Sequence, residues 1–122
     1  MGEVQEIGPL VASVEATQIR FCFADPEAVL LSLPPALEGE LSDFARDNQR
    51  ELATKPVVMD LCGIRFVSSR QLGVMLTVRK ALSPDRSVSL LNVSPTIRRV
   101  LAVTGLEKYF DVAGAPDQIG AS

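Results

Sequence analysis

The 122 residues, 47% of them hydrophobic and 22% charged, predict one globular domain whose core needs no disulfide or structural metal to fold. The chain has no histidine, so Ser-His-Asp and Cys-His catalysis is excluded and a zinc site has no support. The formal net charge of −3 gives no reason to expect nucleic-acid binding.

Two short strands are expected near the N-terminus, at Leu10–Val14 and Gln18–Phe23. The three residues between them, 15–17, suit a hairpin turn. A further apolar run, Val29–Leu33, ends at Pro34 and Pro35 because proline cannot donate to a β ladder.

The middle of the chain predicts a helix, a buried strand and a second helix. Apolar residues recur every three or four positions over Gly39–Leu52, which is typical of an amphipathic helix. The nearly continuous apolar run Pro56–Leu61 indicates a central strand covered on both faces. After a short link, a largely buried helix is expected over Ser69–Leu82.

The C-terminal part predicts a strand at Val88–Leu91, a third helix and an edge strand at 110–112. Ser94 suits the N-cap of this helix, with Pro95 at its first position, where a missing N–H costs nothing. Gly105 is expected to close the helix in the left-handed conformation.

Strands alternating with helices predict an α/β fold with a mixed sheet and helices packed mainly on one face. We expect a single domain over residues 1–113 and a flexible polar tail, Gly114–Ser122.

Charge is divided unevenly along the chain. Residues 1–60 carry 4 basic and 11 acidic side chains, whereas residues 61–122 carry 8 basic and 4 acidic ones. The second half is therefore the expected place to meet an acidic partner, unless folding interleaves the two halves and removes the difference.

The location of the protein is inferred from what the sequence lacks. No apolar stretch approaches the roughly 20 residues that cross a bilayer, and the first residues have no signal-peptide pattern. Cys22 and Cys62 lie in apolar runs without CxxC spacing, so we expect two buried, unpaired thiols in a reducing compartment. A soluble cytoplasmic protein is the expectation.

Two adjacent hydroxyls, Ser68 and Ser69, precede the second helix. Ser68 and Gln71 have the S-x-x-Q spacing of a capping box, which commits the Ser68 side chain to the backbone. Ser69 is then left at a helix N-terminus, where unpaired N–H groups stabilise an anion, so it is the candidate switch residue. An N-cap one residue later, or a plain surface serine, stays open as an alternative for Ser69.

Asp60 ends the central strand and is the one strand-end carboxylate with a claim to catalysis. A single acid without a base, a metal cluster or a phosphate loop does not form an active site. We expect its carboxylate to accept hydrogen bonds from loop amides, and we expect no catalytic residue, metal or cofactor in the chain.

The central segment resembles the STAS domain of bacterial anti-sigma factor antagonists, in which a strand ending in Asp leads into an F-x-[DS]-S-x-G-L-G-V-type loop and helix. The matching residues are Asp60, Phe66, Ser69, Leu72, Gly73, Val74 and Leu76. The later segments Asn92–Leu101 and Thr104–Leu106 resemble the closing helix of the family and its Gly-Leu exit. The resemblance runs over roughly Val11–Val112 and implies a STAS-like mixed sheet.

The resemblance implies a non-enzymatic switch protein. In such proteins an anti-sigma factor with serine kinase activity uses ATP to phosphorylate the serine at the helix start. The unphosphorylated form binds the anti-sigma factor and frees sigma, and the phosphorylated form lets go until a phosphatase resets it. Ser69 aligns with the phosphoacceptor, and Ser68, Ser69, Arg70 and Gln71 form the expected partner-binding surface. Neither nucleic acid nor a membrane is implied, and a homodimer stays open.

Two positions depart from the pattern of the family. Ser68 stands where many members have Asp, and Gln71 stands where a glycine is common. Arg70 either pairs with a phosphate on Ser69 or extends into solvent. The loss of Asp before Ser69 favours an alternative in which the same fold is a scaffold or self-association module in a bacterial signalling complex, without phosphoryl transfer.

Overall fold

A mixed six-stranded sheet organises the residues that the computed structural model describes, which are 3–25, 34–82 and 88–112. The strands lie across the sheet in chain order; β1 to β3 pair antiparallel and β3 to β6 pair parallel. Their bounds are β1 Glu3–Ile7, β2 Leu10–Val14, β3 Ile19–Phe23, β4 Val57–Asp60, β5 Val88–Leu91 and β6 Phe110–Val112. The predicted mixed α/β sheet is confirmed, with β4 in its interior.

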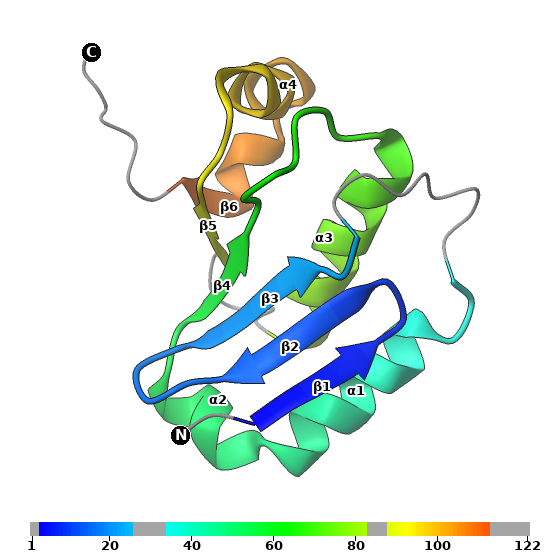
Figure 1. Ribbon diagram of the computed structural model, residues 1–122, viewed down its shortest axis with the longest axis vertical. Coiled ribbons are helices and arrows are strands. Elements are labelled where there is room, and N and C mark those ends of the chain that lie inside the picture. Colours follow the sequence, from blue (N-terminus) through cyan, green and yellow to red (C-terminus); the bar gives the residue numbers. More distant parts are fainter. Residues whose placement is uncertain (1–2, 26–33, 83–87, 113–122) are drawn as a thin grey trace.

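The helices lie mainly behind the sheet as Figure 1 views it. The described residues form α1 Leu37–Asp47, α2 Gln49–Thr54, α3 Ser69–Leu82 and α4 Pro95–Thr104, followed by the single 3-10 turn η1 Leu106–Lys108. α1 and α3 contact each other on one face of the sheet, while α4 lies by the carboxyl ends of β4 and β5 (Figure 1). The prediction of helices packed mainly on one face is confirmed.

The core lies between the sheet and these helices. Phe21, Met59 and Leu90 are in register on three neighbouring strands, and all three are fully buried. The Phe44 ring of α1 meets Phe21 edge to face, with the ring centroids 5.5 Å apart. Because β4 alternates between the two faces, Val58 points to the face opposite the helices, yet it remains only 5% exposed between its register partners on β3 and β5.

Two elements differ from the sequence prediction. β1 was not predicted, because only Ile7 of its five residues is buried and the strand therefore lacks a hydrophobic pattern. The helix expected over Gly39–Leu52 is broken at Asn48, whose backbone has φ −126° and ψ 35°. Asn48 Nδ2 donates to the Phe44 carbonyl oxygen at 2.8 Å, and this side-chain bond competes with continuation of the helix.

The predicted ends of α4 are confirmed. Ser94 Oγ accepts a hydrogen bond from the Ile97 amide at 3.2 Å, and Pro95 is the first helical residue. Gly105 follows the helix at φ 76°, a left-handed conformation that glycine adopts without a Cβ clash. α3 begins and ends at the residues expected from the sequence.

The cysteines differ from the expectation of two buried thiols. Both are free, but Cys22 is half-buried on β3 and Cys62 is exposed. Strand β4 ends at Asp60, so Cys62 lies in the turn that follows and not in the apolar strand.

Several predictions fall on residues outside the described ranges. These are the run Val29–Leu33, the domain boundary at residue 113 and the tail Gly114–Ser122. Among the helices that are described, none has the length and apolar character required to span a lipid bilayer.

Candidate functional site

The start of α3 is held by a reciprocal pair of hydrogen bonds between Ser68 and Gln71. Ser68 Oγ accepts from the Gln71 amide at 3.1 Å, and Gln71 Oε1 accepts from the Ser68 amide at 2.8 Å. This is the capping box predicted from the S-x-x-Q spacing. The Ser68 carbonyl accepts the first helical bond, from Leu72 N at 3.0 Å, so the Ser68 backbone and side chain are both committed to the helix end.

Ser69 is the first residue of α3, and it is exposed. Because Ser68 supplies the capping oxygen, the alternative of an N-cap one residue later is excluded. The first amides of a helix lack intrahelical acceptors, and the helix dipole places partial positive charge there. An anion attached to Ser69 is therefore electrostatically favoured at this position.

The four residues predicted to contact a partner divide into two kinds. Ser68, Ser69 and Arg70 are exposed, whereas Gln71 is buried, with 6% of its surface exposed. The side-chain Oε1 of Gln71 accepts from the Ser68 backbone amide, so Gln71 contributes by holding the loop that presents its three neighbours.

Asp60 joins three parts of the sheet end. Its Oδ1 accepts from Cys62 N at 2.9 Å and from Asn92 Nδ2 at 2.8 Å. Its Oδ2 lies 3.3 Å from Arg20 on β3, and Arg20 also pairs with Glu15 at 3.0 Å. The expectation that Asp60 binds loop amides is confirmed, and the carboxylate links the loops that follow β4 and β5.

A shallow groove of about 630 Å³ lies between these two loops. Residues 61–66 form one wall, and residues 92–94 with Thr96 form the other. On the first wall Phe66 is 74% exposed, and Cys62 and Arg65 are also exposed. Sequence reasoning missed this groove. The parallel pairing of β4 and β5 is the signal that identifies it, because loops after neighbouring parallel strands meet at the carboxyl edge of a sheet.

Comparison with known proteins identifies one family. The model of the STAS domain matches residues 14–118. A STAS-domain containing protein of Pseudomonas aeruginosa (strain UCBPP-PA14) is 33% identical over 78 residues, which cover 62% of this chain and 76% of that protein. No solved structure matches the chain significantly.

Proposed function

We propose, from the fact that the chain belongs to the STAS domain family, that it acts as an anti-sigma factor antagonist. In this proposal the unphosphorylated chain binds an anti-sigma factor that is also a serine kinase. Phosphorylation of Ser69 by that partner, at the expense of ATP, ends the binding until a phosphatase removes the phosphate. The chain itself has no catalytic role.

The observation that carries the proposal is the position of Ser69. It is exposed at the first position of α3, while the neighbouring hydroxyl of Ser68 is engaged by the Gln71 amide. A phosphate on Ser69 adds about −1.5 to −2 charges and three acceptor oxygens beside the unpaired amides of the helix start. A partner docked on this surface meets both the added volume and the added charge.

The two departures from the family pattern are compatible with the same presentation of Ser69. Asp and Ser are equally effective N-caps, so Ser68 supplies the capping oxygen that Asp would supply. Glycine has no side chain to accept a hydrogen bond from the N-cap amide, whereas Gln71 Oε1 accepts one from Ser68 N and completes the capping box. Both changes therefore act on the helix cap, and neither removes the hydroxyl at Ser69.

The test begins with capture of the partner. The unmodified full chain is used to isolate binding proteins from its native lysate, and the captured protein is expected to be a kinase-type anti-sigma factor. Incubation of the purified pair with ATP should add one phosphate to the chain, and Ser69→Ala should abolish it. A scaffold, the alternative function, would capture no such kinase and would carry no phosphate.

Binding of the purified partner then measures the switch. Ser69→Asp should weaken binding at least about tenfold, while Ser69→Ala and Ser42→Asp stay within about threefold. Ser42 is an exposed serine on α1, so Ser42→Asp adds the same charge at a different place. Equal affinities of Ser69→Asp and Ser69→Ala would refute the switch.

A further inference from the structure

The groove between the β4–α3 loop and the β5–α4 segment is held in shape by bonds within the protein. Asp60 Oδ1 accepts from Cys62 N on one wall and from Asn92 Nδ2 on the other. The capping box of Ser68 and Gln71 fixes the start of α3 after the first wall, and the N-cap of Ser94 fixes the start of α4 at the second. A groove with both walls tied in this way loses little conformational freedom when a ligand enters it.

The groove exposes a large aromatic side chain. Phe66 is 74% exposed, although Leu61 and Ile64 of the same loop are 1% and 4% exposed. The loop thus buries its aliphatic residues in the core and leaves its aromatic ring outside. Aromatic residues are enriched in the centres of protein interfaces, where they act as anchors for a partner.

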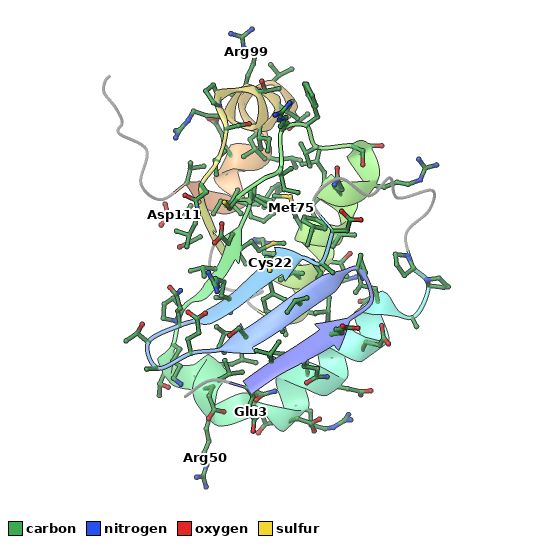
Figure 2. All side chains as sticks on the ribbon, in the orientation of Figure 1. Glu3, Cys22, Arg50, Met75, Arg99 and Asp111 are labelled. Carbon is green, nitrogen blue, oxygen red and sulfur yellow. The ribbon has the colours of Figure 1, made fainter. Side chains whose placement is uncertain are left out.

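The segments that frame the groove are basic. Residues 61–71 and 92–104 contain no Asp, Glu or Lys and four arginines, while the Asp60 carboxylate next to them is engaged by Cys62 N and Asn92 Nδ2. All four are exposed, and none takes part in an ion pair with another described residue; they are Arg65, Arg70, Arg98 and Arg99. Figure 2 shows Arg99 pointing away from the ribbon at the α4 end of the molecule, opposite Arg50 at the α2 end. Arg65 lines the groove itself, and the other three arginines lie on the segments that frame it. This surplus of guanidinium groups is complementary to an acidic surface.

We propose that this groove binds a segment of the partner protein in which an apolar side chain is flanked by Asp or Glu residues. The apolar side chain packs against Phe66 in the groove, and the flanking carboxylates pair with Arg65 and with the arginines of the segments that frame the groove. The inference rests on the proposed function for the existence of the partner, and adds the chemistry by which that partner is recognised. The groove is open and its wall carries an exposed aromatic ring, so a protein segment with an apolar side chain fits it better than a small anion.

The groove also connects recognition with the Ser69 switch. Arg70 directly follows Ser69, and Arg65 lies four residues before it. A phosphate on Ser69 would place negative charge among the arginines that the acidic partner segment needs. The phosphorylated surface would then repel the partner that the unphosphorylated surface attracts.

The test measures binding of the purified partner to three variants of the full chain by isothermal titration calorimetry. Phe66→Ala and Arg99→Glu should each weaken binding at least about tenfold, whereas Arg50→Glu should stay within about twofold. Arg50 is the matched control, because it is an exposed arginine at the opposite end of the molecule (Figure 2). Raising the salt concentration should shrink the effect of Arg99→Glu and leave that of Phe66→Ala unchanged.

The outcomes separate this inference from the proposed function. Affinities of Phe66→Ala and Arg99→Glu within twofold of the unmodified chain would overturn the groove, even if Ser69→Asp still weakened binding. Loss of binding in both groove variants, with no difference between Ser69→Asp and Ser69→Ala, would support the groove and refute the switch. If the two variants instead abolish self-association of the chain, the occupant is a second copy and the inference is wrong. Equal losses for Arg99→Glu and Arg50→Glu would reduce the charge effect to net charge and also overturn it.

Discussion

Removal of the Asp60 carboxylate should destabilise the fold because it ties together β3, the β4–α3 loop and the end of β5. Asp60→Ala removes two short hydrogen bonds, from Cys62 N at 2.9 Å and Asn92 Nδ2 at 2.8 Å, and the contact with Arg20 at 3.3 Å. Hydrogen bonds to a charged acceptor contribute about 1.5–3 kcal/mol each to stability. Cys62 and Asn92 are exposed, so water can satisfy their donors and the net loss is nearer to about 1 kcal/mol each.

The ion pair adds little to this loss. The Arg20 side chain is 42% exposed and keeps Glu15 as a partner, so loss of its ion pair with Asp60 should lower the free energy of unfolding by about 0.5 kcal/mol. We therefore expect Asp60→Ala to lower the free energy of unfolding by about 2–3 kcal/mol. Asp60→Asn keeps an acceptor oxygen for Cys62 and Asn92 but turns an amide toward Arg20, and should cost about 1 kcal/mol.

Urea unfolding followed by far-ultraviolet circular dichroism measures these differences. Fluorescence is less suitable because the chain has no tryptophan and one tyrosine. Asp43→Ala is the control, because Asp43 forms an exposed ion pair with Arg46 on α1 and its loss should change stability by less than about 0.5 kcal/mol. If Asp60→Ala is no more destabilising than Asp43→Ala, at an unchanged dependence on urea, the three contacts do not hold the sheet end.

Two pairs of variants test the backbone conformation after β5 and the cap at the start of α3. Asn92 has φ 58°, a left-handed conformation that glycine adopts more easily than alanine, so Asn92→Ala should be less stable than Asn92→Gly by about 1 kcal/mol. Both variants lose the bond to Asp60, so the comparison isolates the backbone conformation. An alanine variant as stable as the glycine variant in thermal unfolding would contradict the left-handed conformation. Ser68→Ala should lower the free energy of unfolding by about 1 kcal/mol, because the Ser68 hydroxyl caps α3, whereas Ser69→Ala should lower it by less than about 0.5 kcal/mol. Equal losses for the two variants in urea titrations would argue against the capping box.

The parts of the fold that the sequence predicted are those with short-range signals. The S-x-x-Q pair that starts α3 spans four residues, and the Ser94-Pro95 start and Gly105 end of α4 each depend on one or two residues. Such caps act through the backbone next to them, so tertiary context changes them little. Ser69 could therefore be singled out from the sequence, because the cap that engages Ser68 leaves the neighbouring Ser69 hydroxyl without that role.

The parts that the sequence did not predict depend on contacts between distant residues. The bond from Asn92 to Asp60 joins residues 32 positions apart, and the groove exists because β4 and β5 are parallel neighbours. Nothing in the local pattern of either loop reports the presence of the other. Edge strand β1 was missed because four of its five residues are exposed, so its place comes from pairing with β2 and not from burial.

The unequal charge of the two chain halves becomes a spatial separation because the strands are ordered as they are in the sequence. β1 lies at one edge of the sheet and β6 at the other, and α1 and α2 lie with β1, β2 and β3 at one end of the molecule (Figure 1). The acidic side chains of that end are exposed on β1 and α1; they are Glu3, Glu6, Glu38, Glu40, Asp43 and Asp47. The two halves meet where α3 packs against α1, and there Lys80 pairs with Glu38 at 3.3 Å; the acidic side chains of β1 lie at the far edge of the sheet from β5 and β6.

This separation determines how far a phosphate on Ser69 can act. Exposed charges are screened beyond about 8–10 Å at physiological salt, so the acidic end contributes little to the potential at the groove. The segments 61–71 and 92–104 contribute four exposed arginines and no carboxylate, beside the Asp60 carboxylate that links them. A phosphate of about −1.5 to −2 charges would offset close to half of the positive charge of these four arginines, and it would take the whole chain from a net charge of −3 to about −4.5 to −5. In the proposed function, a phosphate on Ser69 would therefore act on an acidic partner through local charge, without requiring a change in the fold.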